Sequence, residues 1–384
     1  MSIFFLMVFV IYGGMHAYVF VRARSAFAFN APAGVLIAVF MLVMVLALFL
    51  IRALEQHEYE IFARVLAYLA YFWMAAVFLF FCALVTLDVT SLLIRAVGRL
   101  SDIAVSPITL SARASFIVSL ILSLSVCLYG YFEARNVLIE KIEIETTKLP
   151  MGIDRLRIVQ ISDVHLGLIV RRMRLKQMLD AVKAANPDIL VSTGDLVDAQ
   201  INHLAGLAEL LRDIKTKYGN YAVTGNHEYY AGLKTALEFT REAGFTILSN
   251  KALTVGPIIV AGVDDRTAVQ LKLEQSISEK DFLATLPKNK FILFLKHQPR
   301  IDQSTIGLFD LQLSGHTHKG QIFPFTLLTK IIFPMIAGTY DLGNGSLLHI
   351  SRGTGTWGPP IRFLAPPEIT IIDVIHRTVH KRDN

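Results

Sequence analysis

Long uninterrupted hydrophobic runs fill the first third of the chain. Four of them lie at residues 3–21, 31–51, 65–87 and 114–132, and a charged residue follows each run. Each is long enough to cross the hydrocarbon core of a bilayer, which takes about 20 residues of helix. A signal peptide does not fit the first run, because no basic segment precedes it and no small-residue cleavage site follows it. The pattern predicts a membrane domain of four transmembrane helices within residues 1–133.

The pattern changes after residue 133 to short hydrophobic runs separated by amphipathic stretches. Apolar and charged residues alternate over 137–149, as in a half-exposed strand. Further strands are predicted at 156–161, 188–191, 221–223, 258–263, 291–295 and 311–313, with helices at 174–185 and 204–217. Because strands and helices alternate, we expect an α/β domain over residues 134–384.

Residues that bind metals stand directly after these predicted strands. They form the motifs Asp163-Val164-His165, Gly194-Asp195, Gly225-Asn226-His227-Glu228, Lys296-His297 and Gly315-His316-Thr317-His318. Open α/β sheets place their ligand sites beyond the carboxyl ends of the strands. Each motif alone is a weak signal, since Gly-Asp after a strand is also a common turn. Five motifs in order, each after a hydrophobic run, predict one shared metal site.

The residue types in these motifs suit the hydrolysis of a phosphate ester. The reaction needs the phosphoryl charge neutralised, a water made nucleophilic at neutral pH and a proton for the leaving oxygen. Two divalent cations about 3.5–4 Å apart meet the first two needs, and a short carboxylate suits the bridge between them. Histidine, aspartate and asparagine without sulfur favour Mn, Fe, Zn, Co or Ni over Cu(I). The motifs therefore indicate a two-metal phosphoesterase.

Residues 156–321 resemble the calcineurin-like metallophosphoesterase family through these motifs and the following Gly320-Gln321. The resemblance extends through the Arg362–Glu368 segment, and does not cover the membrane helices. Within the family, the chain resembles the membrane-anchored subgroup with the motif GHTHxGQ. That subgroup usually has glycine where this chain has Lys319. The implied fold is an α/β/β/α sandwich, in which two β-sheets pack face to face with helices outside.

The resemblance also implies a role for each candidate site residue. One divalent ion, Mn, Zn or Fe, is expected on Asp163, His165 and His318, and a second on Asn226, His297 and His316, with Asp195 bridging the two. His227 matches the catalytic histidine that steadies the phosphate and protonates the leaving group. Asn226 is also expected to contact the substrate. Attack by a hydroxide that bridges the two ions is the implied mechanism.

Composition and isolated polar residues restrict the class of protein and the kinds of site that the chain can contain. With 54% hydrophobic and 18% charged residues, the chain is too apolar for an ordinary soluble protein. The net charge of +6 is spread along the chain and does not indicate nucleic acid as a partner. Cys82 and Cys127 both lie in hydrophobic runs, so no thiolate metal site is expected in the α/β domain. His16 and Asp88 lie in or beside hydrophobic runs, and are functional candidates there, although two isolated groups make no relay.

Membrane residence predicts a lipid bilayer as partner and a phosphoester substrate in or near it. Similar membrane-associated family members cleave phosphodiesters and lipid-linked pyrophosphates, including a nucleotide-diacylglucosamine intermediate. We therefore expect a phosphodiesterase or pyrophosphatase of a lipid-linked substrate. The alternatives are a transporter or sensor with a regulatory phosphoesterase-like domain, an inactive binding scaffold, and an anchored enzyme of soluble phosphoesters.

Two segments near the motifs allow two interpretations each. Residues 322–335 are unusually apolar, and either dip into the membrane interface or hold acyl chains, or else pack between the sheets. Arg171, Arg172, Arg174 and Lys176 either attract anionic headgroups or form a solvated start of a helix.

Arginine placement predicts which side of the membrane the catalytic domain occupies. With the N-terminus outside, the inner loops hold Arg22, Arg24, Arg95, Arg99 and Arg113, and the short outer loop holds Arg52 and Arg64. Arginine concentrates on the cytoplasmic side of membrane proteins. We therefore expect a multi-pass protein of the cell membrane with an extracytoplasmic catalytic domain.

Overall fold

A computed structural model of the chain describes residues 3–101, 109–198, 204, 206–273 and 277–377, with the side chains of residues 3–8 left out. The chain divides into two compact units. The first comprises Met1–Phe132 and Gly358–Ile361, and the second comprises Glu133–Trp357 and Arg362–Asn384.

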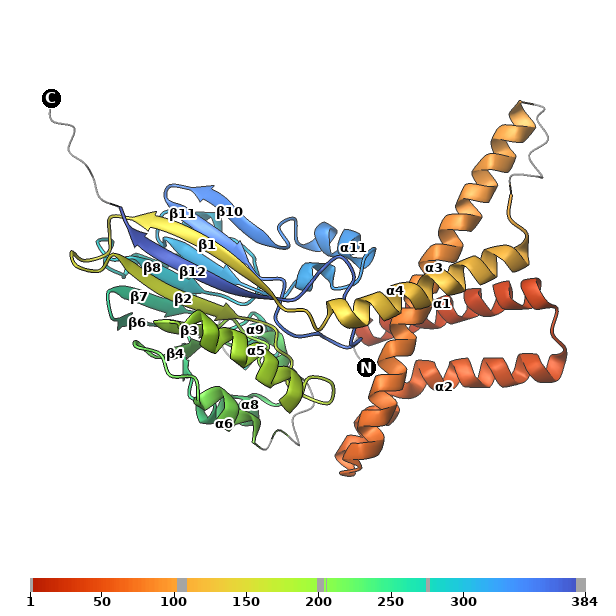
Figure 1. Ribbon diagram of the computed structural model, residues 1–384, viewed down its shortest axis with the longest axis horizontal. Coiled ribbons are helices and arrows are strands. Elements are labelled where there is room, and N and C mark those ends of the chain that lie inside the picture. Colours follow the sequence, from red (N-terminus) through yellow and green to blue (C-terminus); the bar gives the residue numbers. More distant parts are fainter. Residues whose placement is uncertain (1–2, 102–108, 199–203, 205, 274–276, 378–384) are drawn as a thin grey trace. The chain divides into compact units, whose positions relative to one another are not determined.

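Four helices make up most of the first unit (Figure 1): α1 (Ile3–Phe27), α2 (Ala31–Gln56), α3 (Glu60–Leu100) and α4 (Ala112–Glu133). Among the described residues, three of them, α2, α3 and α4, are long and apolar enough to cross a membrane. The prediction of four spans is thus corrected to three. The side chains of α1 are described from Phe9 onward, and they include His16, Arg22 and Arg24.

Helix α3 is longer than its hydrophobic run predicted. It has 41 residues, about twice what a bilayer crossing needs. Arg95 and Arg99, which were expected in a loop, belong to its last turns.

Two residues favour the start of helix α2. The side chain of Asn30 accepts a hydrogen bond from the backbone N–H of Ala33 at 3.1 Å. Pro32 stands in the first turn, where its missing N–H leaves no hydrogen bond unmade.

His16 and Asp88, the two polar residues noted in or beside the hydrophobic runs, both have partners in the helical unit. Arg22 donates to Asp88 at 2.7 Å, and Tyr18 also donates to Asp88. The indole N–H of Trp73 donates to Nε2 of His16 at 2.9 Å. Since an unpaired charge between apolar helices is costly, these contacts give His16 and Asp88 a part in holding the helices together.

Two six-stranded sheets form the second unit (Figure 1). The first has the order β1 (Leu138–Thr146), β12 (Glu368–His376), β2 (Arg155–Ile161), β3 (Ile189–Ser192), β4 (Asn220–Ala222) and β5 (Thr246–Ile247). The second has the order β10 (Gly338–Gly343), β11 (Ser346–Ile350), β9 (Leu311–Ser314), β8 (Ile292–Leu295), β7 (Ile258–Gly262) and β6 (Lys251–Val255). Strand β12 runs parallel to β1 and antiparallel to β2, so it joins the two parts of the first sheet.

The sheets pack against each other through one apolar core. Buried side chains from both contribute to it, among them Ile158, Ile189 and Ile372 from the first sheet and Val260 and Leu293 from the second. Helices complete the unit: α5 (Arg172–Ala185), α6 (Leu207–Arg212), α7 (Asn226–Tyr230), α8 (Leu233–Glu242), α9 (Thr267–Gln270), α10 (Glu279–Ala284) and α11 (Phe325–Ile332). The predicted α/β/β/α sandwich is confirmed.

Most predicted elements of this unit are present, with two differences. The helix predicted at 204–217 covers only Leu207–Arg212, and residue 205 of that range lies outside the described residues. The apolar segment 322–335 contains helix α11, and most of its large hydrophobic side chains are exposed. Packing of this segment between the sheets is therefore excluded.

Candidate metal centre

The eight candidate site residues all follow strands whose carboxyl ends face the same region of the second unit. The first sheet supplies Asp163, His165, Asp195, Asn226 and His227, and the second supplies His297, His316 and His318. Because β2, β3 and β4 are parallel neighbours, as are β8 and β9, residues distant in sequence meet at these ends. The five motifs therefore converge, as their order along the chain predicted.

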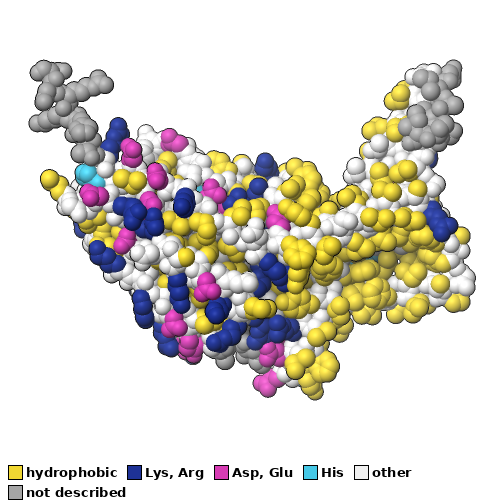
Figure 2. All heavy atoms as spheres, in the orientation of Figure 1, with side chains coloured by type: hydrophobic (Ala, Val, Ile, Leu, Met, Phe, Trp, Pro, Cys, Tyr) yellow, Lys and Arg dark blue, Asp and Glu magenta, His cyan; other side chains and the backbone are white. Residues whose placement is uncertain are grey.

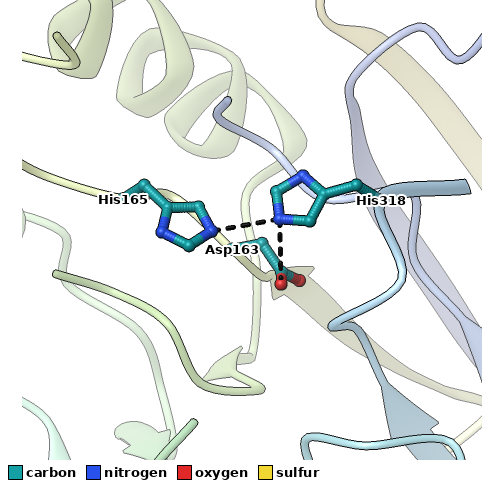
Figure 3. Close-up of side chains that lie close together, drawn as sticks. All are labelled: Asp163, His165 and His318. Atoms are coloured by element: carbon teal, nitrogen blue, oxygen red, sulfur yellow. Dashed lines mark hydrogen bonds and ion pairs between the residues drawn. The ribbon is translucent and has the colours of Figure 1, made fainter. Parts of the chain in front are cut away.

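One group of donors consists of Asp163, His165 and His318 (Figure 3). Nε2 of His165 and Nε2 of His318 are 3.0 Å apart, and Nε2 of His318 lies 3.3 Å from Oδ1 of Asp163. All three side chains are buried. Two imidazole nitrogens and a carboxylate oxygen thus point to one place, as ligands of a single cation do.

A second group consists of Asp195, His297 and His316. Nε2 of His297 lies 3.3 Å from Oδ2 of Asp195, 3.1 Å from Nδ1 of His316 and 3.2 Å from Oδ1 of Asn226. The other ring nitrogen of His297 donates to the backbone carbonyl of Thr193 at 2.8 Å. This bond fixes a proton on Nδ1 and makes Nε2 the ring atom that faces the group.

Asp195 connects the two groups. Its Oδ2 lies 3.8 Å from Nε2 of His165 and 3.3 Å from Nε2 of His297. Its Oδ1 accepts the backbone N–H of His227 at 2.8 Å. The same carboxylate therefore stands beside donors of both groups.

The charges of these side chains suit cation binding. Burial alone would raise the pKa of Asp195, but His297 and His227 hold this pKa well below its ordinary value. Burial would also raise the pKa of Asp163, and the neighbouring His318 and His297 lower it instead. Burial lowers the pKa of His165 to about 3. Anionic carboxylates and neutral imidazoles are the forms in which these side chains bind metals. The donor set therefore fits divalent transition metals.

The three remaining histidines of the two donor groups have shifted pKa values, because of burial and neighbouring charges. Burial lowers the pKa of His316 to about 4 and also that of His318. Burial opposes the charged form of His297 as well, but Asp195 raises its pKa well above the ordinary value. His297 is thus tied electrostatically to the carboxylate that connects the two groups.

The backbone at this site adopts an uncommon conformation. A positive φ occurs at Asp163, His165, Asp195, His316 and His318, and left-handed backbone in residues other than glycine clusters at functional sites. The turns also need glycine where chains approach closely. A Cβ on Gly315 would lie 2.1 Å from Oδ2 of Asp163, and one on Gly225 would lie 2.2 Å from Oδ1 of Asp195.

His227 lies beside the donor groups, with its ring held from one side. Its Nδ1 lies 2.9 Å from Oδ1 of Asp198. Burial opposes the charged form, but Asp195 and Asp198 together raise the pKa of His227 to about 9. The exposed rings of Tyr230 and Trp357 have their centroids 5.6 and 6.1 Å from that of His227. His227 could also join His165 and Asp195 as a metal ligand by distance.

Two buried residues support the site, and neither is among the predicted ligands or catalytic residues. The carboxylate of Glu228 accepts backbone N–H groups of Asp195, Leu196, Val197 and Gly225 at 2.6–3.3 Å. It thereby joins the second motif to the third. The guanidinium of Arg362 is fully buried and lies 3.0 Å from Nδ1 of His318. Glu228 adjoins Asn226-His227 in sequence, whereas no motif marks Arg362.

The structure shows the backbone conformation of Lys319 and the contacts of Arg174, two residues near the site. Lys319 has φ 52°, a left-handed conformation that glycine adopts with less strain. Arg174 is buried and donates to the backbone carbonyl of Ala134 at 2.6 Å and to Thr356 at 3.2 Å. Arg174 is therefore structural, and neither interpretation of the basic cluster applies to it.

Comparison with known proteins identifies the family. The family model of calcineurin-like phosphoesterases matches residues 156–320. An uncharacterized metallophosphoesterase of Aquifex aeolicus is 39% identical over 249 residues, which cover 64% of this chain and 95% of that protein. Another from Campylobacter jejuni is 33% identical over 337 residues, which cover 85% of this chain and 86% of that protein. The chain belongs to the metallophosphoesterase family.

The family explains the chemistry of the site. Metallophosphoesterases are phosphoester hydrolases that use divalent metals, and the clustered carboxylates and imidazoles of this chain fit that requirement. A relative from Danio rerio, named as a transmembrane protein with a metallophosphoesterase domain, is 34% identical over 269 residues, which cover 67% of this chain and 62% of that protein. Together with the three apolar helices, this relative supports membrane association of the metallophosphoesterase described here.

Proposed function

We propose that this metallophosphoesterase hydrolyses phosphodiesters or pyrophosphates in membrane-associated or lipid-linked substrates, with two divalent ions. The position of Asp195 carries the proposal, because its carboxylate lies within 3.8 Å of His165 and 3.3 Å of His297, which belong to different donor groups. A shared anion between two groups is what a pair of closely spaced cations requires.

Each donor group has a proposed role. Asp163, His165 and His318 would hold one ion, and Asn226, His297 and His316 the other, with Asp195 shared between them. Asn226 would also contact the substrate. Bound divalent ions neutralise phosphoryl charge and lower the pKa of water. The bond from His297 to Thr193 and the contact of His318 with Arg362 hold the two rings in place.

His227 is proposed as the proton donor rather than as a metal ligand. Its Nδ1 is engaged by Asp198, so Nε2 is the ring atom left to give a proton to the leaving oxygen. A positioned histidine in this role accelerates such reactions by about 10²–10⁴-fold.

The substrate class follows from the membrane helices on the same chain. Three of its described helices suit a bilayer, so a substrate anchored in the same bilayer is concentrated near the enzyme. We further propose that the protein crosses the cell membrane more than once and that its catalytic unit is extracytoplasmic. Arginine placement in the sequence supports this orientation.

A substrate screen with the full chain in detergent micelles tests the proposed function. The panel contains p-nitrophenyl phosphate, bis-p-nitrophenyl phosphate and a long-chain lipid pyrophosphate, each with Mn, Zn or Fe. Cleavage of the diester or the lipid pyrophosphate in preference to the monoester is expected. Preference for soluble substrates over the lipid would favour an anchored enzyme of soluble phosphoesters, and no metal-dependent cleavage of any substrate would refute the proposal.

A further inference from the structure

Helix α11 carries its hydrophobic side chains outward and its threonines inward. Leu328 and Ile331 are 53% and 77% exposed, whereas Thr329 is 8% exposed. Thr326 donates to the backbone carbonyl of Lys319 at 3.0 Å. A helix on a water-facing surface shows the opposite arrangement. Hydrophobic side chains gather over α11 in Figure 2, and they include Phe325, Leu327 and Ile332, which are 45–61% exposed.

Helix α11 is attached closely to the metal centre. Four residues separate the turn His318–Gly320 from the start of the helix, and a Cβ on Gly320 would lie 2.5 Å from Cα of Thr326. Phe333 follows the helix, and the centroid of its ring is 5.2 Å from that of His316. The exposed hydrophobic face therefore has a fixed position relative to two candidate metal ligands.

A path of hydrogen bonds within the second unit links α11 to the end of a transmembrane helix. Glu133 is the last residue of α4, and its carboxylate accepts the backbone N–H groups of Leu364 and Ala365 at 3.2 and 3.1 Å. The carbonyl of Phe363 accepts the backbone N–H of Phe323, two residues before α11, at 3.1 Å. The end of a membrane-spanning helix lies near the headgroups, and the segments bound to Glu133 are joined through it to the chain that leaves α4.

Exposed side chains along this path suit the membrane interface. Leu364 is 54% exposed and Phe323 is 39% exposed, which extends the hydrophobic face of α11 toward Glu133. Lys330 is the basic residue of α11, and it is exposed. Hydrophobic side chains beside a lysine are typical of helices that lie in the headgroup region, where the lysine meets lipid phosphates.

We propose that α11 lies in the headgroup region of the bilayer that carries the chain's own transmembrane helices. Its outward face, defined by Leu327, Leu328, Ile331 and Ile332, enters the boundary between headgroups and acyl chains. His316 and His318 are thereby held at the lipid surface. The proposal does not depend on which phosphoester the site cleaves.

Fluorescence quenching by spin-labelled lipids tests this placement on the full chain. Ile331→Cys is introduced into a C82A/C127A background, labelled with bimane and reconstituted into phosphatidylcholine–phosphatidylglycerol vesicles. Leu253→Cys on β6 is the matched control, because its side chain is also hydrophobic and exposed, at 42%. A helix seated about 5–10 Å into the interface should be quenched more by a doxyl group near the headgroup than by one near the end of the acyl chain.

The expected result is strong quenching at position 331 and little at 253. Equal quenching at the two positions, whether high or low, would overturn the proposal. A blue-shifted but unquenched probe at 331 would also overturn it, because protein, such as a second copy of the chain, would then cover α11. Melting temperature and metal content of the labelled variants, compared with the unlabelled protein, verify that both remain folded.

Discussion

The Nδ1 atom of His227 lies 2.9 Å from Oδ1 of Asp198, and the side chain of Asp198 is only 15% exposed. The carboxylate therefore holds the imidazole in one orientation, with Nε2 directed away from Asp198. Asp198 stands three residues after Asp195, so one turn supplies both the carboxylate shared by the donor groups and the one that orients His227.

Asp198→Asn should reduce turnover by about 10–100-fold, the usual effect of losing a carboxylate that orients a functional histidine. Metal content should stay unchanged, because Asp198 is not assigned to either ion. In the double variant with His227→Ala, the two losses should not add, since Asp198 acts through His227. Additive losses in steady-state kinetics would show that Asp198 acts elsewhere.

His227→Ala should bind its metals but turn over about 10²–10⁴-fold more slowly. The loss should shrink for substrates with good leaving groups, such as p-nitrophenol, because these need little protonation. Elemental analysis and kinetics on paired good and poor leaving groups provide the measurement. Loss of a metal ion from this variant would instead make His227 a ligand.

Asp195→Ala should remove most bound metal and most activity, because both donor groups lose the carboxylate that connects them. Asp180→Ala is the matched control, since Asp180 is an exposed carboxylate of α5. Elemental analysis of both variants after identical metal loading is the measurement. Two full equivalents of metal in Asp195→Ala, with hydrolysis intact, would refute the shared role of Asp195.

Asp373→Asn should destabilise the second unit in a pH-dependent way. Both oxygens of Asp373 accept hydrogen bonds from Arg157 at 2.8 Å, and this contact lowers the pKa of Asp373. A lowered folded-state pKa adds stability above the unfolded value of about 3.9, and this stability is lost as the pH falls through the folded value. The expected cost at pH 7 is about 1–2 kcal/mol.

Melting temperatures of the full chain in detergent, at pH 7 and near pH 3, measure this effect. The difference between wild type and Asp373→Asn should be largest at pH 7 and shrink in acid. Asp180→Asn, which makes the same change at an exposed position, should melt like the wild type at both pH values. A difference that does not vary with pH would mean that packing, rather than charge, is lost.

A reporter fused after Asn384 should behave as extracytoplasmic, because the arginines Arg22, Arg24, Arg95, Arg99 and Arg113 are assigned to the inner side. Alkaline phosphatase should be active there and green fluorescent protein dark. A fusion placed after Asn30, between α1 and α2, should give the reverse result. The opposite pattern would place the metal centre in the cytoplasm and favour biosynthetic nucleotide-lipid substrates, with the metal chemistry unchanged.

The positions of the candidate ligands were predictable because each of the five motifs follows its own strand. A strand such as Leu311–Ser314 is visible as a short apolar run, and its polar end residues are visible beside it. Parallel pairing brings these ends together within each sheet, and the packing of the two sheets brings Asp163 of the first beside His318 of the second. The roles of the individual residues as ligands or proton donor stay predictions until metal and activity are measured.

Features that depend on tertiary contacts were not predictable. Hydropathy marks the apolar centre of α3 but not its continuation through Arg95 and Arg99. The apolar composition of α11 does not reveal that Thr329 faces inward and Ile331 outward. Arg362 carries no motif, since its partners include the backbone carbonyls of Gly353 and Gly355, which folding brings within reach.

The insertion of β12 between β1 and β2 has a consequence for how the protein is made. The described part of the first sheet contains β12 as the one neighbour of β1 and as a neighbour of β2. In the part of the chain that the structure describes, β12 is also the last strand in sequence order. The nascent chain therefore cannot complete this sheet until Glu368–His376 has been synthesised. If the unit is exported, it remains able to pass unfolded through a translocation channel until then.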